Sequence, residues 1–126
     1  MEKHDGIEAF YAKSRKPWRK WLDKYGQTKT TVWLIIYHKA SETKSITYAE
    51  AVEEALCYGW IDNRANSRDE ESYYLRFTHR KPNGNWSKIN IERAGRMIKE
   101  GLMTEHGQKF IDIAKKNGKW DVTQKE

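Results

Sequence analysis

Residues 31–37 read TVWLIIY, a run that is rich in β-branched and aromatic side chains and almost continuously apolar. Such a run is typical of a β-strand that is covered on both faces, because a strand with one exposed face alternates apolar with polar residues. We therefore predict a strand over residues 31–37 and place it in the centre of a small sheet. The other elements are expected to pack around it.

Helices are predicted immediately before and after this strand. The first is expected to begin after Ser14 and to end at Gly26 in the left-handed conformation. Its apolar residues recur at helical spacing and form one core-facing stripe of Trp18, Trp21, Leu22 and Tyr25. After the strand, Thr47 and Glu50 have the spacing of a capping box, in which the two residues satisfy each other's backbone N–H groups. A second helix therefore begins there, and Gly59 is expected to end it.

A hairpin and two further helices complete the predicted fold. The hairpin strands are expected over Trp60 to Arg64 and Ser72 to Thr78, and the second alternates apolar with polar residues as a half-buried strand does. The third helix should bury one stripe, namely Ile91, Ala94 and Ile98. The fourth should begin near Thr104. The order α-β-α-β-β-α-α predicts an α+β fold, a small antiparallel or mixed sheet packed with helices, in one domain over residues 1–126.

The composition narrows the class of protein. A chain of 126 residues fits one domain, and six Trp, seven Tyr and three Phe should dominate its core. The chain has no run of 18 apolar residues, and its N-terminus, MEKHDGIEAF, lacks the layout of a secretory signal. We therefore expect a cytoplasmic protein without a transmembrane segment. The single cysteine, Cys57, cannot form an internal disulfide and is expected to be a buried packing residue.

The net charge of +6 is concentrated near the N-terminus. Residues 11–29 contain one acidic residue, Asp23, and seven basic residues: Lys13, Arg15, Lys16, Arg19, Lys20, Lys24 and Lys29. Any binding of nucleic acid would use this segment for the phosphates and exposed aromatic residues for stacking on bases. The other interpretation is a solvated helix face, because a modest charge excess is common on small domains.

The first part of a candidate site lies on the predicted hairpin. Trp60, Asp62 and Arg64 are expected to share one face of their strand, because alternate residues of a strand point the same way. Across the hairpin, Arg76 and Thr78 are expected on that same face. The Asp62 carboxylate would then lie beside a guanidinium group, and the fork of arginine suits the carboxylates and phosphates of ligands equally well.

The second part of the candidate site lies where the third helix begins. Ser87 is its expected N-cap, and the free N–H groups of a first helical turn bind anions. Arg80 follows the hairpin towards this point, and Trp60 and Trp86 are the expected walls. The sequence thus predicts a pocket for a small anionic or phosphorylated ligand. The alternative is a structural ion pair, in which Asp62 and an arginine merely position the hairpin.

Other chemistry has little support in the sequence. The four histidines lack metal-ligand spacing, and there is no P-loop, G-x-G-x-x-G motif or G-x-S-x-G nucleophile elbow. No cofactor follows from the residues. A hydrolase or transferase that uses Asp62 is a further hypothesis, with Asp69 as its second carboxylate, although Asp69 falls in a predicted loop where solvation is the expected role.

Several segments carry a recognisable pattern, in the order VWLIIYHKAS, SITYAEAVEEAL, ALCYGWIDNR, YYLRFTHRKP, NWSKIN, GLMTEHGQ and AKKNGKW. Through the ordered combination of GWID, RFT-x-R and WS-x-x-N, the chain resembles the bacteriocin-protection family, also called the YdeI/OmpD-associated family, over about residues 18–120. The resemblance implies protection against bacteriocins or antimicrobial peptides, stress resistance, and association with an outer-membrane porin. It implies no defined biochemical activity.

The motif positions of that family are the candidate ligand-binding residues of this chain: Trp60, Asp62, Arg76, Thr78, Arg80, Trp86, Ser87 and Asn90. Two segments depart from the family pattern. Residues 78–81 read THRK where TPRR is usual, so a single guanidinium remains there, and residues 83–85 read NGN where a serine commonly precedes WS. The expected partner is a small anionic ligand or an acidic peptide, with nucleic acid as the alternative. The motif implies no catalytic role for any residue.

Overall fold

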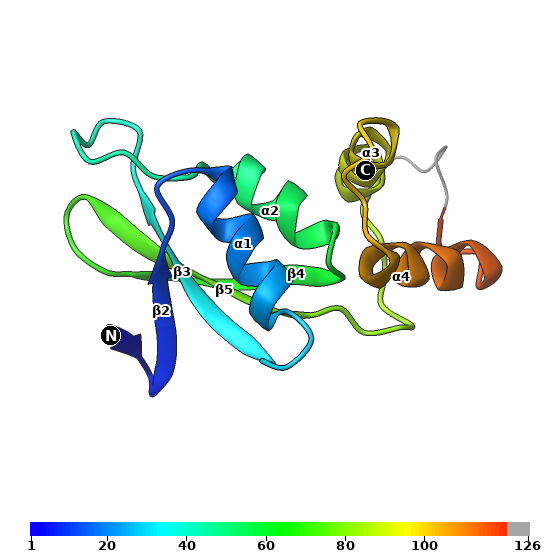
Figure 1. Ribbon diagram of the computed structural model, residues 1–126, viewed down its shortest axis with the longest axis horizontal. Coiled ribbons are helices and arrows are strands. Elements are labelled where there is room, and N and C mark those ends of the chain that lie inside the picture. The colour runs from blue at the N-terminus through cyan, green and yellow to red at the C-terminus, as the bar shows by residue number, and fades with distance from the viewer. Residues whose placement is uncertain (121–126) are drawn as a thin grey trace.

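The computed structural model describes residues 1–120, which form a five-stranded mixed sheet and four helices (Figure 1). The strand order is β1-β2-β3-β5-β4. The strands are β1 (Lys3–His4), β2 (Ile7–Tyr11), β3 (Thr31–Tyr37), β4 (Trp60–Ser67) and β5 (Ser72–His79). β2 and β3 run parallel, and the other neighbouring pairs are antiparallel. The strand predicted over residues 31–37 is indeed the central one.

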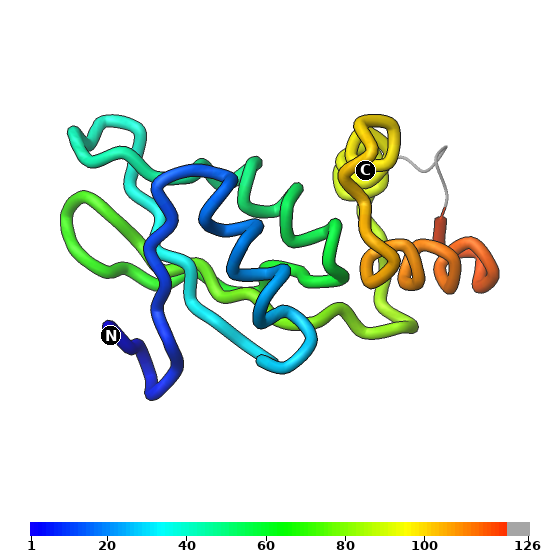
Figure 2. Tube along the Cα trace, viewed as in Figure 1, coloured from blue at the N-terminus to red at the C-terminus, as the bar shows by residue number. Residues whose placement is uncertain are grey.

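Two of the helices cover one face of the sheet, and two lie beyond its end. Figure 1 shows α1 (Arg15–Tyr25) and α2 (Tyr48–Leu56) together on one face. The chain trace in Figure 2 then leads from β5 to α3 (Lys88–Lys99) and α4 (Glu105–Lys116), which lie past the end of α2. Over residues 1–120 none of the helices is long and apolar enough to cross a bilayer. The predicted α+β class is confirmed, and the sheet is mixed.

The main core lies between the sheet and the helices. Its largest fully buried side chains are aromatic, as the composition predicts: Trp18, Trp60 and Phe77 face this layer. β3 contributes alternate residues to both faces, with Leu34 on the helix side and Trp33 on the opposite side, and both are buried. β3 is therefore covered on both faces, which explains its almost continuous apolar sequence.

The face of the sheet opposite the helices is covered by a hairpin that the sequence analysis did not predict. β1 and β2 are joined by Asp5 and Gly6, whose φ angles of 52° and 75° are both positive, as a tight two-residue turn requires. The His4 ring stacks on Tyr74 with 4.2 Å between centroids and meets the Trp33 ring edge-on at 4.7 Å. The hairpin thereby buries an aromatic surface that would otherwise be open.

Glu2 fastens this hairpin to the sheet, and its contacts predict a pH dependence of stability. The Arg68 guanidinium donates bonds of 2.8 and 2.9 Å to the Glu2 carboxylate, and Tyr74 donates a third. These bonds lower the pKa of Glu2 from its ordinary value of 4.5 to about 2. Because the pKa is depressed in the folded state, this carboxylate stabilises the fold above pH 4.5, and the contribution is lost as the pH falls towards 2.

We expect Glu2→Gln to flatten the pH dependence of stability on the acid side of pH 4.5, as measured by urea denaturation at a series of pH values. The matched control is Glu42→Gln, which changes an exposed glutamate in the loop before α2 and should leave the slope as it is in the unchanged protein. Equal slopes for the Glu2→Gln variant and the unchanged protein would contradict the role of Glu2.

Three details of the predicted helices are wrong. Gly26 has a right-handed φ of −61°, and its carbonyl accepts a hydrogen bond from the Trp60 indole at 3.0 Å. Ser14 precedes α1, but its side chain makes no capping bond. In α3 the buried stripe continues through Met97, whereas Ile98 is 40% exposed. By contrast, the capping box of Thr47 and Glu50 is present in both directions.

Candidate functional site

The structure does not group Asp62 with Arg64 and Arg76 on one face of the hairpin. Asp62 lies opposite Phe77, whose side chain is in the core on the helix side. Arg64 lies opposite Arg76, and a β-bulge at Asn63 separates the two registers. A bulge adds one residue to one strand, so side chains beyond it point to the other face. Arg64 therefore points away from the helices. Arg76 is the neighbour of Phe77 in β5, so strand alternation also places it on the opposite side of the sheet from Asp62.

Two other predicted site residues, Trp60 and Thr78, have structural contacts in the core and in the sheet. The Trp60 side chain is fully buried, and its ring meets the Trp21 ring edge-on at 5.7 Å between centroids. Trp60 is therefore a core residue and not the wall of a pocket. Thr78 lies on the face opposite the helices, where its hydroxyl accepts a bond of 2.8 Å from the Asn63 amide. That bond ties the bulge to β5.

Arg80 and Trp86 do lie together, as the sequence analysis expects. The Arg80 guanidinium carbon is 3.7 Å from the centre of the Trp86 ring, and one terminal nitrogen donates to the Asn85 carbonyl at 3.1 Å. Arg80 is only 5% exposed, and this burial lowers its pKa to about 10. The charge of Asp62 acts in the opposite direction and favours the charged guanidinium.

Ser87 and Asn90 form the start of α3. The Ser87 hydroxyl accepts from the Asn90 backbone N–H at 3.2 Å, which confirms the predicted N-cap. The Asn90 side-chain oxygen accepts from Arg93 at 3.0 Å, within the same helix. Both residues therefore have local roles at the helix terminus.

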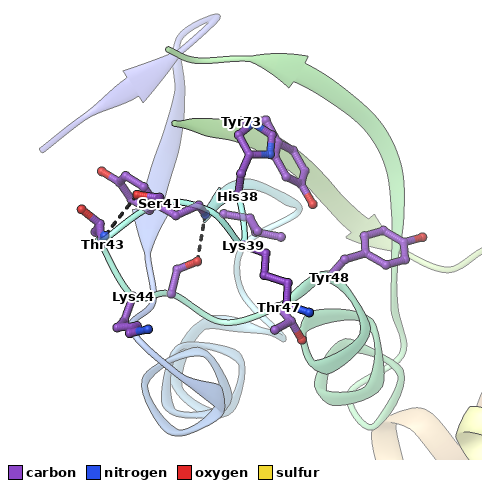
Figure 3. Close-up of a pocket in the computed structure, with 11 residues that line it drawn as sticks. His38, Lys39, Ser41, Thr43, Lys44, Thr47, Tyr48 and Tyr73 are labelled. Atoms are coloured by element: carbon purple, nitrogen blue, oxygen red, sulfur yellow. Dashed lines mark hydrogen bonds between the residues drawn. The ribbon is translucent and has the colours of Figure 1, made fainter. Parts of the chain in front are cut away.

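A hollow lies elsewhere, between the end of β3, the start of α2 and β5 (Figure 3). We call it the loop pocket, because the loop over residues 38–47 forms most of its wall. Its volume is about 540 Å³. The lining residues are Ile36, Tyr37, His38, Lys39, Ser41, Thr43, Lys44, Ser45, Thr47, Tyr48 and Tyr73.

Hydroxyl side chains hold the loop of this pocket in shape. Ser45 accepts a bond of 2.8 Å from the backbone N–H of Tyr37 and donates to the Ile46 carbonyl at 3.0 Å. Ser41 accepts from the backbone of Thr43 at 3.1 Å, and Figure 3 shows both bonds that the two serines accept. Side-chain hydrogen bonds thus hold the loop against the end of β3.

The charge of the loop pocket is positive. Lys39 and Lys44 line it, no acidic side chain does, and neither lysine forms an ion pair within residues 1–120. In Figure 3 the Lys39 side chain runs towards Thr47, the N-cap of α2. The ammonium groups and the first turn of a helix both favour negative charge. The pocket therefore attracts anions.

Aromatic side chains border the same pocket, and one of them connects it to Asp62. The His38 ring stacks on Tyr73 at 5.4 Å between centroids. Tyr48 donates a hydrogen bond of 2.9 Å to the Asp62 carboxylate. Burial is the largest cause and this hydrogen bond the second cause that raise the pKa of Tyr48 to about 12. In Figure 3 the Tyr48 ring points outward. The Asp62 carboxylate thus accepts a hydrogen bond from Tyr48 and is not among the residues that line the pocket.

Metal and thiol chemistry have no visible site in the described part of the chain. Within residues 1–120 no group of His, Cys, Asp and Glu side chains is placed to hold a metal ion. Cys57 is fully buried, as predicted, and burial raises the pKa of its thiol to about 11. A thiol with so high a pKa is protonated at neutral pH and is a poor nucleophile.

The basic N-terminal segment is partly neutralised by two buried glutamates of α2. Arg15 contacts Glu53 at 2.7 Å and Glu54 at 2.8 Å, and Arg19 contacts Glu54 at 2.9 Å. Arg96 of α3 reaches Glu53 at 2.7 Å. These pairs join α1, α2 and α3, so both arginines of the segment have structural partners.

Sequence reasoning did not identify the loop pocket. A signal was present: a loop with two lysines and four hydroxyl residues, HKASETKSIT, leads from a buried strand into a capped helix. Ligand-binding residues are concentrated on loops that a rigid scaffold positions. That composition, next to the N-terminus of a helix, was sufficient to mark residues 38–47 as a candidate.

The comparisons with known proteins give one result. A family model described as a domain of unknown function (DUF8412) matches residues 10–110. Neither the comparison with curated proteins nor that with solved structures gave a match. The matched residues include the whole loop pocket and Arg80.

Proposed function

Because the chain belongs to the family described as a domain of unknown function (DUF8412), we propose a function from its own geometry: it is a small binding domain that takes an anionic ligand in the loop pocket. The observation that carries this proposal is the pairing of Lys39 and Lys44 with a hollow that no acidic side chain lines. Two ammonium groups without carboxylate partners attract an anion from solution.

The size and lining of the loop pocket favour a phosphorylated small molecule. A volume of about 540 Å³ is within the range of small-molecule sites. Lys39, Lys44 and the hydroxyls of Thr43 and Thr47 can donate hydrogen bonds to phosphate oxygens, whereas the Ser41 hydroxyl donates to Glu71 at 2.8 Å. The Tyr73 ring offers an apolar surface to the remainder of the ligand. Sugar phosphates and nucleotides have both of these parts.

The cellular setting proposed for this binding domain is protection against bacteriocins and stress in the cytoplasm. The resemblance of GWID, RFT-x-R and WS-x-x-N to the bacteriocin-protection family supports this setting. Several of these motif residues build the fold, because Trp60 fills the core, Arg80 stacks on Trp86 and Ser87 caps α3. In this proposal the motif maintains the scaffold, and the loop pocket takes the ligand.

The two alternative functions receive less support from the geometry. A nucleic-acid-binding function would need the basic segment to contact phosphates. Arg15 and Arg19, two of its seven basic residues, already form ion pairs with glutamates. For a hydrolase, Asp69 lies in the loop beyond the end of β4, and the five residues of extended strand from Asp62 to Ser67 alone span about 16 Å at 3.3 Å per residue. Paired catalytic carboxylates in glycosidases are about 5–10 Å apart.

The proposal predicts that a phosphorylated ligand stabilises the protein. The purified protein is screened by thermal shift against nucleotides, sugar phosphates and acidic peptides. A ligand at 100 times its Kd should add about 2.7 kcal/mol to the free energy of unfolding. The double variant Lys39→Gln, Lys44→Gln should lose this response, because it removes both cations of the pocket. In a bacterial host the same variant should give less protection against bacteriocin than the unchanged protein.

The matched control is the double variant Lys13→Gln, Lys99→Gln. It changes the net charge by the same amount at two exposed positions outside the pocket. It should bind the ligand as the unchanged protein does. If both double variants lose binding equally, the attraction belongs to the net charge, and the loop pocket is not the site. The proposal also fails if none of the three ligand classes raises the melting temperature.

A further inference from the structure

Arg80 carries a buried charge that no carboxylate contacts. The side chain forms no ion pair within residues 1–120, although the residue is only 5% exposed. One terminal nitrogen, Nη2, donates to the Asn85 carbonyl, and the Trp86 ring covers one face of the guanidinium. The other terminal nitrogen, Nη1, is buried and has no hydrogen-bond acceptor among residues 1–120. A buried donor without an acceptor destabilises a fold, and a bound anion that accepts from it would remove this penalty.

Arg80 also lines a second hollow, which we call the exit pocket because it lies where the chain leaves β5. Its volume is about 340 Å³. Its polar wall is formed by Asn63, Thr78, His79, Lys81 and Asn85, and no acidic side chain lines it. Lys81 brings a second cation to the pocket, and it forms no ion pair within the described residues.

The fold holds the Arg80 guanidinium at this place from three sides. Trp86 packs against its face, Asn85 accepts from Nη2, and the Arg80 backbone N–H donates to the Gly59 carbonyl at 2.8 Å. Asp62 adds a negative charge that favours the protonated form without contacting it. A fixed guanidinium with an unused N–H is the arrangement that binds an oxyanion in a defined orientation.

We infer that the exit pocket is a second anion site, in which Arg80 and Lys81 bind a small oxyanion such as a phosphate or a carboxylate group. One oxygen accepts from Nη1 of Arg80, and the Lys81 ammonium neutralises the remaining charge. The Asn63 amide is held by Thr78 at the edge of the same pocket and gives it a polar rim. This site shares no residue with the loop pocket, so it stands independently of the proposed function.

The test follows the guanidinium signals of Arg80 and the indole signal of Trp86 by NMR during titration with inorganic phosphate. Sodium chloride holds the ionic strength constant, and acetate replaces phosphate in a parallel titration. We expect a saturable shift of both signals with phosphate, with acetate, or with both, and the stronger of the two identifies the preferred oxyanion. Shifts that follow only the total salt concentration would overturn the inference.

Variants separate the exit pocket from the loop pocket and from a loss of folding. Lys81→Gln changes an exposed side chain, so it should fold, and it should weaken anion binding about twofold to fivefold, the range for one exposed charge pair. Arg80→Lys keeps the charge without the fork and should abolish the saturable Trp86 shift. Lys39→Gln, Lys44→Gln should leave the Arg80 titration unchanged. An unaltered affinity in Lys81→Gln, or a titration lost in the loop-pocket variant, would assign the anion to another place.

Discussion

Trp60→Ala is expected to lower the free energy of unfolding by about 3–5 kcal/mol, the range for truncating a fully buried aromatic side chain. The Trp60 ring contacts the rings of Trp21 and His79, at 5.7 and 4.5 Å between centroids. Its indole N–H also satisfies the Gly26 carbonyl where α1 ends. Alanine would leave a cavity between α1 and the sheet and an unpaired carbonyl beside it. Urea denaturation followed by circular dichroism measures the change.

Trp60→Phe is the matched control, because it retains an aromatic ring and removes only the N–H and part of the volume. We expect it to cost about 1–3 kcal/mol, the penalty for a buried group that loses its partner. Neither variant should change ligand affinity at temperatures where it is folded, since Trp60 lines neither the loop pocket nor the exit pocket. A loss below about 1 kcal/mol for Trp60→Ala would mean that the core is not packed around this ring.

Gly59→Ala should destabilise the protein by about 2–5 kcal/mol, the sum of about 1–2 for the left-handed backbone and about 1–3 for overpacking. Gly59 has a φ of 79° between α2 and β4. An added methyl carbon would come within 2.6 Å of the Phe110 ring and 2.9 Å of the His106 carbonyl oxygen. Its neighbours cannot move away easily, because α4 is packed on this turn. Urea denaturation measures the change.

Two further glycines separate strain from crowding in the same experiment. Gly118 has a φ of 75° and open space around its α-carbon, so Gly118→Ala should cost only about 1–2 kcal/mol of backbone strain. Gly95 lies inside α3 with nothing near it, and alanine there should stabilise the helix by up to about 1 kcal/mol. If Gly59→Ala costs no more than Gly118→Ala, the close contact between α4 and the α2–β4 turn is not present in solution.

Local sequence signals predicted the elements whose structure depends on nearby residues. β3 is apolar on both faces because helices cover one face and the β1–β2 hairpin covers the other, and its sequence reflects both layers. The capping box of α2 and the N-cap of α3 are bonds within four residues, so spacing alone identifies them. The first hairpin was missed although Asp5-Gly6 is a strong turn signal, because its strands are short and carry mixed residues.

The predicted site failed where it relied on an uninterrupted strand. Alternation from Trp60 places Arg64 on the helix side, but the bulge at Asn63 puts Arg64 on the other side. Arg76 was placed with Asp62, yet Asp62 pairs with Phe77, so the neighbouring Arg76 faces away from the helices. Arg80 and Trp86 are close in sequence, and their contact could be anticipated. The composition of residues 38–47 was sufficient to mark that loop as a candidate, but the shape of the loop pocket could not be predicted. It depends on the hydrogen bond from the Tyr37 backbone to Ser45 and on Tyr73 from a distant strand.

The extra residue in β4 has a consequence for aligning this chain with other members of its family. Gaps are usually placed in loops, where insertions are tolerated. Here, a relative that lacks the residue equivalent to Asn63 would have no bulge, and the positions of Arg64 to Ser67 would keep their present partners on β5 and their present sides. A single-residue gap therefore belongs at Asn63, inside this strand. If the gap is moved to the loop after β4, the four positions from Arg64 to Ser67 are aligned with residues that point to the opposite side.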